Sequence, residues 1–311
     1  MLSRVAESLF WIARNTERAE TLARLLDVTA AGSVDRGTHH REAVERQWEA
    51  VYTVAGIEPP EPGPRAHAAD AIERIAFGAE DERRSVCACL RIARRNAVGV
   101  RAELTTEVWE CLNGLYLFVE AQSPRALGPD GASSFLRSVR DTTQAFAGIC
   151  DATLSHDDGW DFLVAGRYLE RAWMTARILS AHDDGADSAH AWQRVLEACC
   201  ASEPFARARR QSSDPADALA FLALSDVFPR SIRFCVREVD RALHRISGTP
   251  AGTYANEAER ASGRISAALG YYSANEVSED GARVFAGRAQ RWLAEIGDAV
   301  TAAYFPRVPV A

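Results

Sequence analysis

Arginine and glutamate side chains that could bind an anion recur at the same spacing in two parts of the sequence. The pattern R-x-x-E-R-A-x-x-x-A-R-x-L occupies residues 14–26 and is repeated at residues 167–179. Guanidinium groups bind carboxylates and phosphates through two parallel hydrogen bonds, so each copy combines one acid with several groups that recognise acids. The candidate binding residues are Arg14, Glu17, Arg18 and Arg24 in the first copy and Arg167, Glu170, Arg171 and Arg177 in the second.

Both copies of the pattern are expected on helices. Residues three, four and seven positions apart face the same way on a helix, so the first arginine, the glutamate and the last arginine of each copy share one stripe. The two alanines of each copy are four positions apart and form a stripe of small side chains that another helix can approach closely. Each motif helix therefore carries a carboxylate between guanidinium groups, beside a surface suited to tight helix packing.

The pattern leaves two roles open for these charges. Two motif helices that cross at the centre of the protein could exchange Glu–Arg pairs, and breaking one such buried pair would cost about 3–5 kcal/mol. Alternatively, the arginines line a polar cavity that binds phosphate or carboxylate, with Glu17 or Glu170 as a general base or a cation ligand. Neighbouring arginines lower the pKa of a glutamate, which suits a ligand or an orienting group better than an acid.

A second pair of similar segments indicates that the whole chain is a tandem duplication. Residues 84–95 and 230–241 both begin with Arg-Ser, and both then carry a cysteine and further arginines at matching positions. Self-similarity of this kind identifies how a chain is built. We therefore predict two pseudo-symmetric helical repeats, residues 1–155 and 156–311, that share one core in a single globular unit.

The fold class predicted for both repeats is all-α, a helical bundle. Apolar residues recur at three- and four-residue spacing nearly throughout, which is typical of amphipathic helices, and alternating strand patterns are scarce. The helices are expected at residues 3–31, 41–55, 66–77, 85–104, 106–122, 133–155, 160–181, 188–201, 215–224, 230–246, 255–273 and 279–304.

Composition limits the classes of function and partner. The net charge of −7 argues against nucleic-acid binding, which normally needs a basic surface. No apolar run approaches the ~20 residues of a membrane span, and no signal peptide is recognised at the start, so we expect a cytoplasmic protein that does not bind membranes. The 36 basic residues are all arginine, which excludes Schiff-base and P-loop lysines.

The sequence predicts neither a cofactor nor a metal site. Glycine-rich nucleotide motifs and zinc-protease motifs are absent. His156 and His182 each precede Asp-Asp, but helix capping by aspartate is the simpler explanation. The seven cysteines are irregularly spaced and odd in number, which favours reduced residues of the core over a disulfide or zinc framework.

Several segments resemble one known family over essentially the whole chain. Residues 2–20 and 166–172 are similar to the two signatures of the bacterial alpha-E family, an all-helical family named for its Glu-Arg motif, and residues 106–113 and 229–234 are similar to further family segments. One position departs from the family pattern, because Arg95 stands where an acidic residue is common. If that acid belongs to a shared site, the site is altered in this chain.

The resemblance implies a functional context that the residues alone do not supply. Alpha-E proteins are associated with a circularly permuted ATP-grasp ligase and a transglutaminase-like cysteine peptidase, which implies a role in peptide or amide-bond synthesis and processing. We therefore expect a helical accessory protein that binds the ligase or holds its substrate in an Arg/Glu-lined groove. The alternative is an enzyme or a binding protein for anionic ligands with a central site at Glu17, Glu170 and the arginine cluster.

Overall fold

The computed structural model describes residues 1–34, 41–60, 67–78, 84–124, 129–182, 188–208 and 214–305. Within these ranges all regular structure is helical, which confirms the predicted all-α class. The first half contains α1 (Ser3–Val34), α2 (Arg41–Ala55), α3 (His67–Ala71), α4 (Val86–Gly99), α5 (Thr106–Glu120) and α6 (Pro129–Thr153). The second half contains α7 (Asp158–Ser180), α8 (Ser188–Ala198), α9 (Ser202–Ala208), α10 (Pro215–Leu224), α11 (Ile232–Ser247), α12 (Glu257–Tyr271) and α13 (Ala274–Tyr304).

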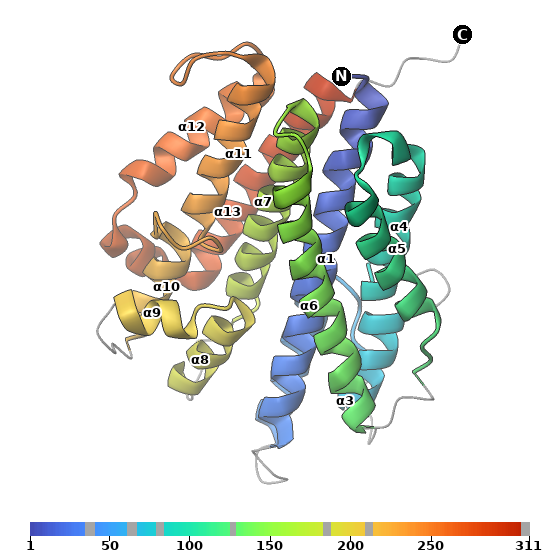
Figure 1. Ribbon diagram of the computed structural model, residues 1–311. Coiled ribbons are helices and arrows are strands. Elements are labelled where there is room, and N and C mark those ends of the chain that lie inside the picture. Colours follow the sequence, from blue (N-terminus) through green and yellow to red (C-terminus); the bar gives the residue numbers. More distant parts are fainter. Residues whose placement is uncertain are drawn as a thin grey trace.

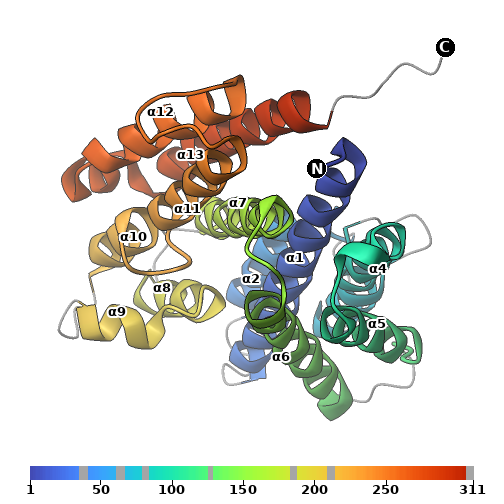
Figure 2. The ribbon, with the colours of Figure 1, turned by 45° about the horizontal axis from the view of Figure 1, so that its top comes forward.

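The two helices that carry the repeated motif lie at the centre of the bundle. α1 and α7 pack against each other, with α4, α5 and α6 on one side and α10 to α13 on the other (Figures 1 and 2). α1 packs on α4 and α6, and α7 packs on α11 and α13. The duplication itself stays a prediction, as does the division after residue 155, which falls in the short connection between α6 and α7.

Side-chain caps explain where several helices begin. Ser85 precedes α4 and accepts a hydrogen bond from the backbone N–H of Ala88, and Ser231 precedes α11 and accepts one from Phe234. Asp157 caps α7 in the same way. Such caps satisfy backbone N–H groups that lack a partner within the helix. Capping is thus the role of Asp157, the first residue of the first Asp-Asp pair, whereas the second pair, residues 183–184, lies outside the described residues.

The helices differ from the predicted ranges mainly at their ends. The helix expected at 66–77 continues from α3 into a π-helical turn, Ile72–Phe77, and the one expected at 85–104 ends at Gly99 before a short 3₁₀ turn. α9, at Ser202–Ala208, falls between two expected helices, in a range where the sequence pattern predicts none. α13 begins at Ala274, where Ser273 and Glu276 form a capping box, but its backbone leaves the helical conformation at Gly281 (φ 73°, ψ 164°). The long helical run therefore starts close to residue 279, as predicted, and a short helical turn precedes it.

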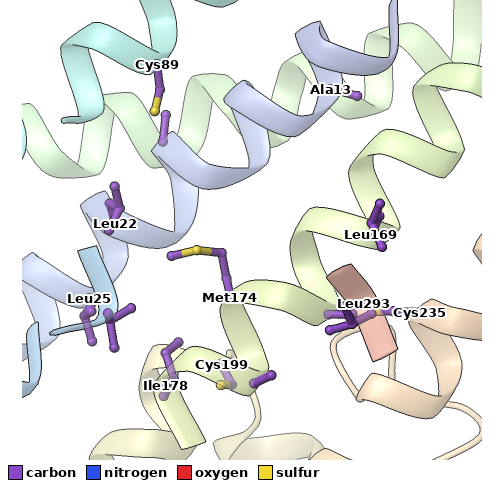
Figure 3. Packing of buried hydrophobic residues seen from close by; sticks show 14 of the residues in the cluster. Ala13, Leu22, Leu25, Cys89, Leu169, Met174, Ile178, Cys199, Cys235 and Leu293 are labelled. Carbon is purple, nitrogen blue, oxygen red and sulfur yellow. The ribbon is translucent and has the colours of Figure 1, made fainter. Parts of the chain in front are cut away.

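Buried hydrophobic residues from both halves of the chain form one cluster. Met174 of α7 extends toward α1 near Leu22, while Leu169 of α7 lies near Leu293 of α13 (Figure 3). No disulfide joins the seven cysteines, and five of them are buried. Burial raises the pKa of the Cys87, Cys150, Cys199 and Cys235 thiols to about 12, so these residues act as small apolar groups of the core.

No helix in the described ranges combines the length and the apolar character needed to cross a membrane.

The crossing of α1 and α7 is close enough to require a glycine. A Cβ atom placed on Gly166 of α7 would lie 2.3 Å from the backbone carbonyl oxygen of Phe10 in α1. Ala19 and Ala172, both from the repeated pattern, are fully buried in the core. Gly166 therefore allows the close approach of the motif helices, while the role of the alanine stripe stays a prediction.

We expect Gly166→Ala to lower the free energy of unfolding by about 1–3 kcal/mol or more, because the added methyl group meets backbone atoms that cannot turn away. Gly114→Ala in α5 is the control. Its new methyl group would meet no atom within 4 Å, so a gain of about 0.5–1 kcal/mol is expected from the better helix former. Urea unfolding measures both changes, and equal stabilities for the two variants would contradict the close crossing.

Candidate functional site

The motif helices exchange their Glu–Arg pairs. Glu170 of α7 accepts hydrogen bonds from Arg14 Nε at 2.7 Å and from Arg18 Nε at 2.6 Å, both from α1. In the opposite direction, Arg171 of α7 donates to Glu17 of α1 from Nε at 2.7 Å and from Nη2 at 2.8 Å. Each carboxylate is therefore held by the other helix, as the structural interpretation of the pattern requires.

Glu170 is fully buried and its charge is matched. Burial by itself would raise the pKa of this carboxyl group, but the charges and hydrogen bonds of Arg14 and Arg18 outweigh burial and hold the pKa below its ordinary value. An ionised carboxylate with both oxygens bonded to guanidinium groups is a poor proton acceptor. Glu170 is therefore a structural ion-pair partner and not a general base.

A second carboxylate, missed in the sequence, lies beside Glu17. Glu20 accepts a hydrogen bond from Arg230 Nη2 at 2.9 Å, pairs with Arg24, and accepts another from Gln144 Nε2 at 3.2 Å. Burial alone would raise the pKa of Glu20, but the charges of Arg230 and Arg24 lower it to about 2. Two features of the sequence could have identified Glu20 and Arg230. Glu20 follows Glu17 by three positions, so both lie on one helix face, and Arg230 is the first residue of the second repeated segment.

A cavity of about 370 Å³ adjoins this network. Its polar walls come from Glu17, Glu20, Gln144, Arg167, Arg171 and Arg230. Its apolar walls include Phe146, Ala147, Cys150, Trp160, Leu163 and Phe228. The cavity thus combines one charged wall with an apolar interior, the usual composition of a small-molecule site.

Arg167 is the arginine of the motif that the network leaves unused. Its counterpart in the first copy is Arg14, whose Nε holds Glu170. The Nε of Arg167 is buried and has no hydrogen-bond partner in the protein, because Arg230 approaches Glu17 instead, with Nη1 at 3.4 Å from Oε1. A buried donor without a partner costs about 1–3 kcal/mol. The structure therefore holds a guanidinium group at the cavity with hydrogen-bonding capacity to spare.

The remaining predicted residues lie apart from the cavity. Arg24 is bonded to Glu20 behind the cavity wall. Arg177 donates to the carbonyl oxygen of Thr53 at 2.5 Å, at the C-terminal end of α2, where carbonyl groups lack partners within the helix. Burial lowers the pKa of Arg177, and repulsion from Arg18 and a neighbouring arginine lowers it further. Arg95, the departure from the family pattern, is exposed on α4 and is not among the cavity residues.

The buried donor without a partner makes anion binding the chemistry that this cavity could support. All four carboxylate oxygens of Glu17 and Glu20 accept arginine hydrogen bonds, so both carboxylates are already paired with positive charge. Cys200, which also lines the cavity, is kept as a thiol because burial raises its pKa. No group of three or more potential metal ligands occurs among the described residues.

We expect Glu170→Gln to lower the free energy of unfolding by about 3–5 kcal/mol, because it removes a fully buried carboxylate and leaves two partly buried guanidinium groups without a counter-charge. Glu107→Gln on the exposed side of α5 removes the same charge and should change stability by less than about 0.5 kcal/mol. Urea unfolding of the two variants provides the comparison. A loss below about 1 kcal/mol for Glu170→Gln would show that the exchanged pair does not hold the helices together.

Comparison with known proteins identifies a family but no activity. The model of the Alpha-E family, described as a predicted alpha-helical domain with a conserved ER motif, matches residues 1–305. Uncharacterized proteins of Mycobacterium tuberculosis and Mycobacterium bovis are 26% identical over 279 residues, which is 83% of this chain and 31% of each relative. The chain thus spans about a third of the length of these relatives. No solved structure matches it.

Proposed function

The chain belongs to the Alpha-E family, and from this premise we propose that it is a helical binding protein that holds a carboxylate-bearing ligand in the cavity beside Glu17. The observation that carries the proposal is the buried Nε of Arg167, which has no partner in the protein and borders that cavity. A ligand carboxylate would supply the acceptor that Glu170 supplies to Arg14 in the first copy of the motif.

The lining favours a carboxylate attached to an apolar body. One guanidinium fork matches the two oxygens of a carboxylate, whereas enclosing a phosphate takes several donors. The apolar walls, among them Phe146, Trp160 and Phe228, would bury the rest of the ligand. Catalysis at Glu17 is less favoured, because arginine hydrogen bonds occupy both of its oxygens and leave no free base.

We expect Arg167→Gln to weaken the binding of N-acetylphenylalanine roughly ten- to a hundredfold, the worth of a charge-assisted hydrogen bond of about 1.5–3 kcal/mol. The free energy of unfolding should stay the same or rise, because the Nε of Arg167 that the substitution removes has no hydrogen-bond partner in the ligand-free protein. Calorimetric titration measures the affinity. Arg95→Gln, which removes an exposed guanidinium group, and N-acetylphenylalanine amide, which lacks the charge, are the controls. Equal affinity of the wild-type protein for acid and amide would contradict the proposal.

The wider role that we propose is that of an accessory protein in a system that makes and processes peptide or amide bonds. Its partners would be a circularly permuted ATP-grasp ligase and a transglutaminase-like cysteine peptidase, as the family resemblance implies, and its location would be cytoplasmic. The mycobacterial relatives support a role beside another polypeptide, because the matched region makes up only 31% of each of those longer chains. In this proposal the cavity holds the substrate and the ligase supplies the chemistry.

A tagged copy of the protein, purified gently from its native host, should bring down an ATP-grasp ligase in stoichiometric amount. Mass spectrometry of the eluted proteins makes the measurement. Gly114→Ala, which changes only an exposed helix position, should bring down the same ligase. A preparation with neither ligase nor peptidase would contradict the accessory role and leave ligand binding to be judged by the titration above.

A further inference from the structure

A second cavity lies next to the candidate site on the same side of α7 and shares two lining residues with it. It has a volume of about 250 Å³, and Trp160 and Leu163 border both cavities. The α7 residues that line the two cavities include positions 160, 163, 167 and 171, which are three or four residues apart and so share one helix face. α6 also lines both, through residues between Thr143 and Cys150 in the first cavity and through Thr153 in the second.

The two cavities offer opposite charges at their far ends. The first presents the spare guanidinium group of Arg167. The second is lined by Glu103 and Asp157, both exposed, and by Met1, whose amino group lies 4.0 Å from Asp158. Asp157 also accepts a capping hydrogen bond from Gly159 N at 2.9 Å, and the two carboxylates against one amino group leave this end negative. Thr105 and Thr153 add hydroxyl groups to this wall, 2.9 Å from each other. An anion is therefore favoured at one end and a cation or hydrogen-bond donor at the other.

The distance between the ends sets the length of a ligand that could reach both. Asp157 and Arg167 are separated by ten residues at the start of α7, which corresponds to about 15 Å at a rise of 1.5 Å per residue. An extended peptide advances about 3.3–3.6 Å per residue, so about four or five residues cover this distance. A single amino acid would fill only the first cavity.

We infer that the ligand is an extended zwitterionic peptide of about four or five residues, with its carboxylate at Arg167 and its amino terminus at Glu103 and Asp157. This inference rests on the proposed function, because it assumes that a carboxylate binds at Arg167. It adds the chemical class of the ligand, its direction along α7 and its length. Trp160 and Leu163 would contact the middle of the chain.

The length can be tested with peptides that end in phenylalanine with a free carboxylate and carry zero to five alanines before it. Calorimetric titration of the wild-type protein should show affinity rising at least tenfold between two and five residues and then levelling. If N-acetylphenylalanine binds but affinity does not depend on length, the inference fails and the proposed function stands. If no acid in the series binds more tightly than its amide, both fail.

The direction can be tested by removing one charge from each partner. Acetylation of the amino terminus of the five-residue peptide should weaken binding to the wild-type protein about two- to fivefold, the range for an exposed ion pair. It should have a smaller effect on binding to Glu103→Gln, which keeps only Asp157 at that end, whereas Glu107→Gln, outside both cavities, should behave like the wild type. An acetylation effect that is the same in all three proteins would overturn the assignment of the amino terminus to Glu103.

Discussion

The exchange of Glu–Arg pairs between α1 and α7 constrains the rest of this structure. Moving a carboxylate out of water costs several kcal/mol, and only guanidinium groups at hydrogen-bond distance offset that cost. Glu170 meets this condition through Arg14 and Arg18, but only because α1 approaches α7 closely at Gly166. A slip of either helix by one turn would leave buried charges without partners, so the ion pairs fix the register in which α4, α6, α11 and α13 pack around the centre.

The candidate site arises where the two copies of the motif stop being equivalent. In one, Arg14 and Arg18 together hold a single carboxylate. In the other, Arg171 holds Glu17 with two hydrogen bonds, Arg230 reaches toward the same carboxylate, and Arg167 is left over. The matching position in α7 to Glu20 is Trp173, so the additional carboxylate exists on one side only. One arrangement is a closed ion pair and the other opens onto a cavity.

This asymmetry gives a physical account of how one fold can supply both stability and binding. The closed pair satisfies its own hydrogen bonds and needs no ligand. The open arrangement keeps a donor buried without a partner, which costs free energy that a bound acceptor would recover. The neighbouring pairs, Arg171 with Glu17 and Arg230 with Glu20, hold the wall of the cavity rigid, and a rigid site loses little entropy when a ligand binds.

The helical class, most helix positions, the arginines and glutamates of the repeated motif, and the family could all be predicted from the amino-acid sequence. These follow from local rules, since apolar spacing, capping serines such as Ser85 and Ser231, and the spacing of charges on a helix depend on residues close in the chain. Which arginine pairs with which carboxylate depends instead on how the helices pack. Arg167 and Arg14 occupy the same place in the motif, and their difference comes from Arg230, which lies far away in sequence and reaches Glu17 only when α11 packs on α7. Long-range packing, which no local pattern encodes, therefore makes one copy of the motif a closed ion pair and leaves the other open to a cavity.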